Sequence, residues 1–353
     1  MPDTILLPLD GSPLAELALP FAERLARATD AHIVAVRAIA PPVPAALQAE
    51  VESYLETVAS RLRDQGLSVE TVAPAGAPAA AILQEARARG AGMIVLSSHG
   101  RSGVGRWVYG SVADRVLRQA PVPVMLTAHA DTVRWRPEQP LRMLVPLDGS
   151  VLGETALDSA RELAQKLHAE MVLMRVVEPV FYDMAYHPPM DPAPELEAAR
   201  VYLDTVAGQV VAGGSAVPVT VRVEFGQAVG TIAQVAAELP AGLIAMATHG
   251  RSGLARFVMG SVATGVLQRA GVPLLLVRPA DAVASAPVRA GETLSDMGAA
   301  DSHEAVFPVS DVHLSPDELD LVLRGLDGLL SRPGVDSDLA RVQSLAERLR
   351  GPG

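Results

Sequence analysis

The stretch ILLPLDGS at residues 5–12 returns later in the chain as MLVPLDGS at residues 143–150. A second stretch, HGRSG at residues 99–103, returns at residues 249–253. Around the second stretch, the two copies are identical at more than half of their positions without a gap. Similarity of this extent inside one chain indicates two copies of one domain.

The repeat sets the domain boundaries that we expect. The first copy spans residues 1–130, and a linker at residues 131–140 joins it to the second copy at residues 141–280. Residues 281–311 are rich in Ala, Ser, Gly and acidic residues, which is typical of a second linker. Residues 312–353 carry apolar side chains at helical spacing and predict a helical C-terminal hairpin.

Within each copy, short apolar runs alternate with segments of helical spacing. Residues 4–9 are almost continuously apolar, which is typical of a strand that is buried on both faces. Residues 13–29 follow with apolar side chains at helical intervals, which predicts one helix. The expected strands are residues 4–9, 33–39, 69–73, 93–97 and 122–127 in the first copy, and residues 142–147, 171–177, 219–224, 243–247 and 272–277 in the second. This order predicts an α/β fold in which each copy is an open, five-stranded parallel sheet with helices on both faces.

The composition excludes several classes of protein. The 353 residues carry a formal net charge of −11, which argues against an extended nucleic-acid surface because phosphate binding needs clustered Lys and Arg. Cysteine is absent, so disulfides, Cys-ligated metal sites and Cys nucleophiles are excluded. Lys166 is the one lysine and no Gly-Lys-Ser/Thr occurs, which excludes a Walker phosphate loop. Every apolar run is too short to cross a membrane and the N-terminus lacks a basic signal region, so we expect a cytoplasmic protein without membrane contacts.

Asp10 and its repeat Asp148 stand where the first strand of each copy is expected to end. In open parallel sheets, ligands bind beyond the carboxyl ends of the strands. One interpretation is structural, in which the carboxylate or the following serine caps the next helix. The other is functional, in which the carboxylate faces a cleft and accepts a hydrogen bond from an amine or hydroxyl of a ligand.

A glycine-rich loop precedes the last helix of each copy. In the first copy, Gly100 and Gly103 permit a tight backbone, and Arg101 adds positive charge. Gly110 and Ser111 open the helix, where free N–H groups and the positive end of the helix dipole attract an anion. The alternative is a glycine-rich turn with a serine cap and a solvated arginine. Both interpretations extend to the second copy, where the same residue types return as Gly250, Arg251, Gly253, Gly260 and Ser261.

With these motifs, each copy resembles a universal stress protein domain. The resemblance rests on LPLDGS at residues 7–12, SSHGRSG at residues 97–103, GSV at residues 110–112 and PVPV at residues 121–124, and it covers nearly all of both copies. It implies a Rossmann-like fold of the adenine nucleotide alpha hydrolase-like type. In the nucleotide-binding branch of that family, it also implies ATP held by a Gly-x2-Gly-x9-Gly-Ser/Thr loop.

The resemblance also implies where the nucleotide lies. The first glycine of the loop is replaced by Ser97 in one copy and by Ala247 in the other. In the family the aspartate after the first strand contacts the adenosine, and the backbone after the second strand contacts the adenine. The candidate binding residues are therefore Asp10, Ala38, Gly100, Arg101, Gly103, Gly110, Ser111 and Val112 in the first copy, and Asp148, Val176, Gly250, Arg251, Gly253, Gly260, Ser261 and Val262 in the second.

The resulting hypothesis is a stress-response regulator that binds ATP, with or without Mg²⁺, in one or both clefts. Hydrolysis needs a positioned water and charge neutralisation, and no acidic pair with metal-like spacing accompanies the loop, so no residue is assigned a catalytic or metal-binding role. Two alternatives stay open. One is a slow ATPase that uses the same cleft, and the other is an interaction module that binds no nucleotide.

Two features predict contacts beyond the single domain. The last strands of the copies, residues 122–127 and 272–277, lie at sheet edges that must be paired or covered. The resemblance implies that they pair with each other in an internal pseudo-dimer, and a further homodimer of two chains is compatible with it. The C-terminal hairpin is too short to bury its apolar stripe alone, so we expect it to dock on the chain's own domains or on an unknown protein partner.

Overall fold

The fold is described from a computed structural model of the chain. The structure describes residues 3–97, 110–127, 135, 141–179, 191–213, 217–239, 241–248 and 259–278. The chain divides into two compact units, residues 1–288 and 289–353, and all of the described residues lie in the first unit. The expected linker at residues 281–311 and the expected hairpin at residues 312–353 lie outside the described residues.

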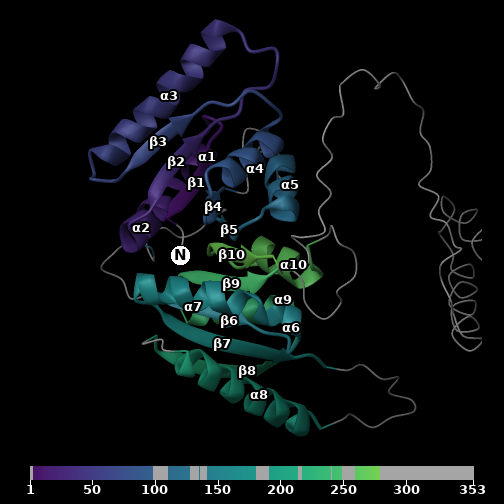
Figure 1. Ribbon diagram of the computed structural model, residues 1–353. Coiled ribbons are helices and arrows are strands. Elements are labelled where there is room, and N and C mark those ends of the chain that lie inside the picture. The colour runs from purple at the N-terminus through teal and green to yellow at the C-terminus, as the bar shows by residue number, and fades with distance from the viewer. Residues whose placement is uncertain are drawn as a thin grey trace, which may run out of the picture. The chain divides into compact units, whose positions relative to one another are not determined.

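The first copy alternates strands and helices as the sequence predicts (Figure 1). Its elements are β1 (Thr4–Pro8), α1 (Pro13–Glu16), α2 (Leu19–Thr29), β2 (His32–Val36), α3 (Ala45–Arg63), β3 (Val69–Val72), α4 (Pro78–Ala88), β4 (Met93–Leu96), α5 (Ser111–Gln119) and β5 (Val124–Leu126). Within this copy the paired strands are parallel, and they follow the order β3-β2-β1-β4-β5. This is the open, doubly covered sheet that was expected.

The second copy has the same architecture. Its elements are β6 (Arg142–Pro146), α6 (Val151–Glu154), α7 (Ala156–Leu167), β7 (Glu170–Val177), α8 (Ala193–Ala212), β8 (Val219–Phe225), α9 (Ala228–Glu238), β9 (Leu243–Ala247), α10 (Ser261–Arg269) and β10 (Leu274–Val277). Its strands follow the equivalent order β8-β7-β6-β9-β10 and are again parallel. The expected fold class is confirmed for both copies.

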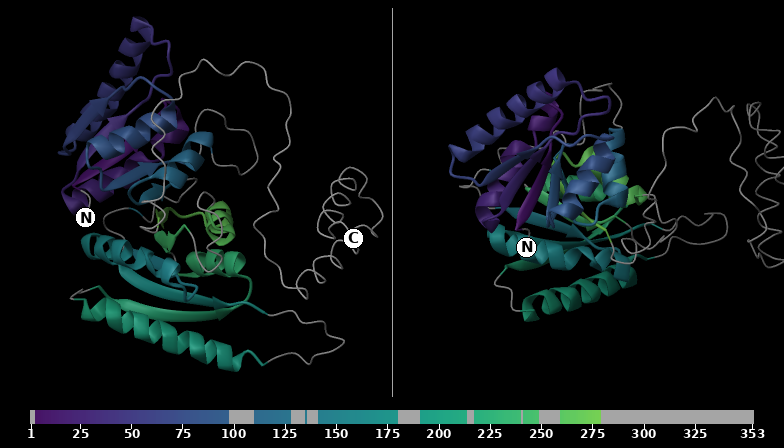
Figure 2. Two further views of the ribbon diagram at one scale, coloured as in Figure 1. Left: turned by 45° about the vertical axis from the view of Figure 1, so that its right-hand side comes forward. Right: turned by 45° about the horizontal axis from the view of Figure 1, so that its top comes forward.

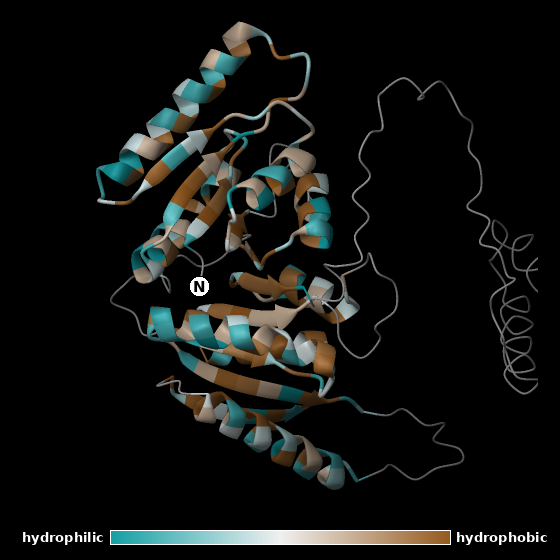
Figure 3. Ribbon diagram, in the orientation of Figure 1, coloured by the Kyte–Doolittle hydropathy of each residue, from teal (hydrophilic) through white to brown (hydrophobic). Residues whose placement is uncertain are grey.

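Each sheet buries apolar side chains on both of its faces. In β1, Ile5 and Leu7 belong to a core with α2 and α3, whereas Leu6 belongs to a core with α4 and α5. The helices of the second copy divide in the same way, with α7 and α8 on the first core and α9 and α10 on the second. Figures 2 and 3 show the helices on both sides of the apolar strands. Burial on both faces explains why the strands are continuous apolar runs in the sequence.

The prediction of one helix over residues 13–29 is wrong, because this segment forms α1 and α2. Pro20 has no N–H group, and in a continuous helix its ring would meet the carbonyl of Glu16. The chain instead makes a tighter turn, in which the Leu17 and Ala18 N–H groups donate to carbonyls three residues back, at 3.3 and 3.2 Å. The second copy breaks at the same place, between α6 and α7, without a proline.

The two copies join into one sheet of ten strands through their last strands. β10 pairs with β5 in antiparallel register, with Leu275 opposite Met125. Both of these side chains are fully buried. The expected internal pseudo-dimer is therefore confirmed, and both apolar cores continue from one copy into the other.

Trp135, in the segment between the copies, is 3% exposed and contacts both of them. Its ring meets the ring of Phe21 on α2 edge-on, with 5.1 Å between the ring centroids. The guanidinium of Arg24 lies 5.5 Å from the centroid of the Trp135 ring. The indole N–H donates to the carbonyl of Gly242 in the second copy. Trp135 thus links the two copies in addition to the β5–β10 pairing.

We predict that Trp135→Ala lowers the free energy of unfolding by about 3–5 kcal/mol, because it removes a large buried ring and leaves the Gly242 carbonyl without its donor. Chemical denaturation followed by circular dichroism measures this change. Trp135→Phe is the matched control, since it keeps a ring against Phe21 and loses only the donor, so it is expected to cost less. Equal midpoints for the wild type and Trp135→Ala would contradict this role.

Candidate functional site

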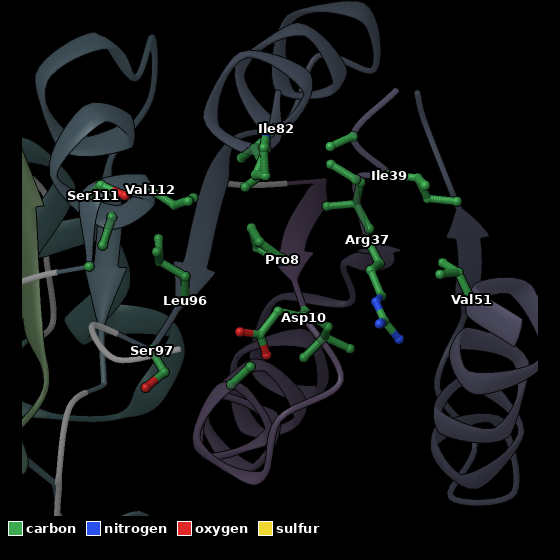
Figure 4. A pocket seen from close by; sticks show the side chains of 18 of the residues that line it. Pro8, Asp10, Arg37, Ile39, Val51, Ile82, Leu96, Ser97, Ser111 and Val112 are labelled. Carbon is green, nitrogen blue, oxygen red and sulfur yellow. The ribbon is translucent and has the colours of Figure 1, made fainter. Parts of the chain in front are cut away.

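A cavity of about 490 Å³ opens at the carboxyl ends of β1, β2 and β4 in the first copy (Figure 4). It lies where the strand order changes direction between β1 and β4, which is where open α/β sheets bind ligands. Five of the residues expected from the sequence line it, namely Asp10, Ala38, Gly110, Ser111 and Val112. Structure and sequence therefore indicate the same cleft.

Most of the side chains that line the cavity are apolar. Ile39, Leu47 and Val51 line it next to the end of β2, and Ile82 and Leu96 line it from α4 and β4. Figure 4 shows Ile39, Val51, Ile82 and Leu96 around the opening between the strand ends. Apolar walls with a few placed polar groups are typical of small-molecule sites, and such walls suit a flat aromatic ring.

The peptide of Ala38 faces the cavity because of the strand geometry. Arg37 and Ile39 donate their N–H groups to Val72 and Pro74 on the β3 side, at 3.1 and 2.9 Å. Adjacent residues of a strand direct their backbone groups to opposite neighbours, so Ala38 points to the β1 side. The last bond on that side runs from the Leu9 N–H to the carbonyl of Val36, and β1 then leaves the sheet. The N–H and C=O of Ala38 are thus directed to the cavity, which Ala38 lines.

Asp10 carries a structural role and also lies at the cavity. Its Oδ1 accepts a hydrogen bond from the N–H of Ser12 at 2.8 Å. Ser12 is the N-cap of α1, and its Oγ accepts from the N–H of Ala15 at 3.1 Å. The structural interpretation is therefore correct for Ser12 and for one oxygen of Asp10. In Figure 4 the Asp10 carboxylate points toward the side of Ser97, and Asp10 lines the cavity.

The start of α5 brings polar groups to the cavity. Gly110 is the N-cap and offers no side-chain acceptor, so the first N–H groups of the helix have no capping partner from it. Ser111 and Val112 place these groups at the cavity wall. Ser97, at the end of β4, also lines the cavity, and its buried Oγ has no hydrogen-bond partner among the described residues. A hydroxyl and a helix N-terminus together suit an anionic group.

The second copy arranges the equivalent residues in the same order. Asp148 accepts from the N–H and the Oγ of Ser150, at 3.0 and 2.6 Å. Val176 directs its backbone groups toward the β6 side, since the neighbouring Val177 carbonyl accepts from Gly226 on the β8 side. The Gly260 N–H donates to the carbonyl of Thr248 at 2.8 Å, which holds the start of α10, with Ser261 and Val262, at the end of β9.

Six of the expected binding residues cannot be placed. Gly100, Arg101 and Gly103 of the first copy lie outside the described residues. The same holds for their repeats Gly250, Arg251 and Gly253. Their roles stay predictions from the sequence.

One cation of the cavity was not among the sequence candidates. Arg37 follows β2, lines the cavity and is 8% exposed. Its guanidinium carbon lies 5.3 Å from the centroid of the Tyr54 ring, within range of a cation–π interaction. The Tyr54 hydroxyl donates to Oε1 of Glu16 at 3.1 Å. Burial and the Glu16 carboxylate raise the pKa of the Tyr54 phenol above its ordinary value, so the hydroxyl stays a donor at neutral pH.

The second copy repeats this cluster. The Arg175 guanidinium lies 5.0 Å from the centroid of the Tyr202 ring, and the Tyr202 hydroxyl donates to Oε1 of Glu154 at 2.7 Å. Burial and the Glu154 carboxylate likewise raise the pKa of the Tyr202 phenol. An arginine at the same place in both copies is the sequence signal that could have identified the cluster.

The glycine that follows each aspartate is required by the backbone and by the arginine. Gly11 has φ +82°, and a Cβ there would lie 2.7 Å from Nη1 of Arg37. Gly149 has φ +80°, and a Cβ there would lie 2.7 Å from Nη1 of Arg175. Because the glycine of Asp-Gly-Ser has no side chain, the guanidinium lies directly against the backbone next to the aspartate.

The described part of the chain lacks two features of other protein classes. No three His, Asp or Glu side chains gather there at positions that could hold a metal ion. Within the same residues, no helix has the length and apolar character to cross a membrane.

The two copies define an α/β protein with Rossmann-like topology and a cleft at the carboxyl ends of its strands. The chain matches the Universal stress protein family over residues 1–128 and 141–278. It belongs to this family, as a member with two domains in tandem, and the resemblance stated from the motifs is confirmed.

Similar proteins share the tandem arrangement. A universal stress protein of Mycolicibacterium smegmatis is 29% identical over 295 residues, which cover 78% of this chain and 97% of that protein. The universal stress protein Rv2623 of Mycobacterium tuberculosis is 29% identical over 294 residues, with 78% and 96% covered. The crystal structure of a putative universal stress protein from Pseudomonas aeruginosa superposes with a TM-score of 0.60 at 22% identity, covering 80% of this chain and 95% of that one. The last similarity supports the fold alone.

We predict that Gly11→Ala destabilises the chain more than Gly66→Ala. Gly66 also has φ +82° but has open space where a Cβ would lie, so alanine there costs only the backbone strain, about 1–2 kcal/mol. Gly11→Ala adds the displacement of the Arg37 guanidinium. Thermal and chemical unfolding of both variants give the comparison. Equal losses would mean that Arg37 moves away from Gly11 without cost.

Proposed function

We propose that the protein binds ATP in the cleft of the first copy and in the equivalent cleft of the second, and that it acts as a nucleotide-dependent regulator of the stress response. The observation that carries this proposal is the cavity of about 490 Å³ at the carboxyl ends of β1, β2 and β4. Its apolar walls suit the adenine, the peptide of Ala38 suits the base edge, and the start of α5 suits the phosphates. Asp10 lies between them and suits the adenosine hydroxyls or amine.

The residues present fit a binding role better than a dedicated catalytic one. Phosphoryl transfer needs a group that orients the attacking water and cations that neutralise the developing charge. The described cavity residues offer one carboxylate, Asp10, and its Oδ1 is already engaged by the N–H of Ser12. Mg²⁺ would reach the site with the nucleotide, held by its phosphates. Slow ATP hydrolysis in the same cleft is the second candidate function.

The remaining assignments follow from the same proposal. We place the protein in the cytoplasm, where ATP is available to it. The partners that we assign are the adenine nucleotide and a protein that responds to the bound state, reached through the C-terminal residues 312–353. A homodimer of chains is compatible with this assignment, and nucleic acid is not, because of the net charge of −11.

The first test is to denature freshly purified protein and to identify and count the released nucleotide by chromatography. We expect about two adenine nucleotides per chain if both clefts bind and about one if a single copy binds. Titration of the emptied protein with Mg-ATP checks sites that were vacated during purification. Neither released nucleotide nor binding of added Mg-ATP would overturn the proposal and favour an interaction module.

The second test replaces Asp10 and Asp148 with asparagine. Asparagine keeps an acceptor for the N–H of the following serine, so the turn before the helix survives, but it puts a donor where the ligand needs an acceptor. We expect Asp10→Asn and Asp148→Asn each to weaken ATP binding at their own cleft about tenfold or more, with little change in melting temperature. Asp158→Asn, on the exposed surface of α7, is the control. Unchanged binding in the double variant would show that the site assignment is wrong.

A further inference from the structure

Arg37 is a buried cation that the proposed binding of ATP does not use. It follows β2, lines the cavity and is 8% exposed. Its described contact is the face of the Tyr54 ring, 5.3 Å from the guanidinium carbon. Among the described residues, no acidic side chain forms an ion pair with it and no acceptor receives a hydrogen bond from it.

The guanidinium of Arg37 keeps contact with solvent, because none of its nitrogens is among the buried side-chain atoms that lack a hydrogen bond. Burial of a charge is costly unless an opposite charge or hydrogen-bond acceptors compensate for it. The Tyr54 ring supplies part of the compensation. The nearby Glu16 accepts instead from the Tyr54 hydroxyl and lies 3.6 Å from Arg61. An acceptor that arrives with a ligand would replace this solvent.

The cavity therefore has two separate positive features. The start of α5 lies at one side of it, with Ser111 and Ser97, and Arg37 lies at the other, beyond Asp10 (Figure 4). In that view the Asp10 carboxylate points toward Ser97, whereas the Arg37 guanidinium points the other way. A ligand whose phosphates all form one chain reaches only one of these features. A ligand that reaches both carries anionic groups at two places.

The position of Arg37 indicates where the second anionic group would be attached. In dinucleotide-binding Rossmann folds, an arginine near the ribose accommodates a phosphate on its 2′ hydroxyl. Arg37 directly follows β2, and its Nη1 lies against Gly11, next to the Asp10 that we assign to the adenosine. Arg175 of the second copy has the same place against Gly149.

We propose that the first cleft prefers adenine nucleotides that carry an additional phosphate on the 2′ or 3′ hydroxyl of the ribose, and that Arg37 is the residue that selects them. The inference rests on the proposed function, since it assumes an adenine nucleotide in this cleft. The 5′ phosphates lie at the start of α5, and the ribose phosphate accepts hydrogen bonds from the guanidinium. Arg37 is thus a determinant of specificity rather than a part of the phosphate site at α5.

The test compares isomers. ADP and adenosine 3′,5′-bisphosphate have the same composition and differ in where the second phosphate is attached, and adenosine 2′,5′-bisphosphate is the third isomer. Calorimetric titrations are made in the full-length Asp148→Asn chain, so that the first cleft dominates. We expect this variant to bind one or both of the bisphosphates at least about tenfold more tightly than it binds ADP. The two bisphosphate arms show which hydroxyl carries the preferred phosphate.

Variants of Arg37 decide whether this residue is responsible. Arg37→Met keeps the long side chain and removes the charge, and we expect the ratio of the ADP and bisphosphate dissociation constants to fall to about one. Arg37→Lys keeps a charge and is expected to retain part of the ratio. Arg175→Met is the matched control in the other copy and is expected to leave the ratio unchanged. Because both dissociation constants are measured in the same variant, their ratio does not change if a substitution weakens the binding of all ligands equally.

Three outcomes would overturn the inference, and they differ in whether the proposed function fails as well. If ADP binds and the bisphosphates bind no better, the proposed function stands and the preference is wrong. If the preference exists but survives in Arg37→Met, another residue selects the ribose phosphate. If none of the adenine nucleotides binds, the proposed function fails and the inference fails with it.

Discussion

The backbone pairing between β5 and β10 is the interaction on which the described part of the chain depends. Without it, each copy would expose the edge of an apolar last strand, and Met125 and Leu275 would lose their burial. With it, the two sheets become one, and both apolar cores run through both copies. Trp135 strengthens the same junction with a ring contact on one side and a hydrogen bond on the other. The two copies therefore fold as one unit and not as two independent domains.

Much of the fold can be predicted from the sequence, for physical reasons. Strands buried on both faces must be apolar runs, and a second copy shows each run twice, so their number and order are clear. Asp10 and Ser111 were found because they follow strands or begin helices, where parallel sheets concentrate their binding groups. The break between α1 and α2 was missed, because the apolar spacing continues through Pro20 and hides the lost N–H group.

Arg37 and Trp135 show what the linear pattern does not contain. In the sequence, an arginine after an apolar run predicts the exposed end of a strand. Its burial results from Tyr54, which comes from α3, and from the missing side chain of Gly11 on the β1 loop. A tryptophan in a linker reads as an isolated apolar residue, and its partners Phe21 and Gly242 come from different copies. The sequence reports which residues are apolar or charged, but their partners depend on the folded arrangement.

The antiparallel register of β5 and β10 determines where the strand ends of the two copies lie relative to each other. The strands within each copy are parallel, so the carboxyl ends of one copy and those of the other lie at opposite ends of the ten-stranded sheet. The carboxyl ends of β1 and β6 therefore face away from each other, with the length of the strands between them. Asp10 directly follows the strand end of one copy and Asp148 that of the other, so the two aspartates lie at opposite edges of the same sheet.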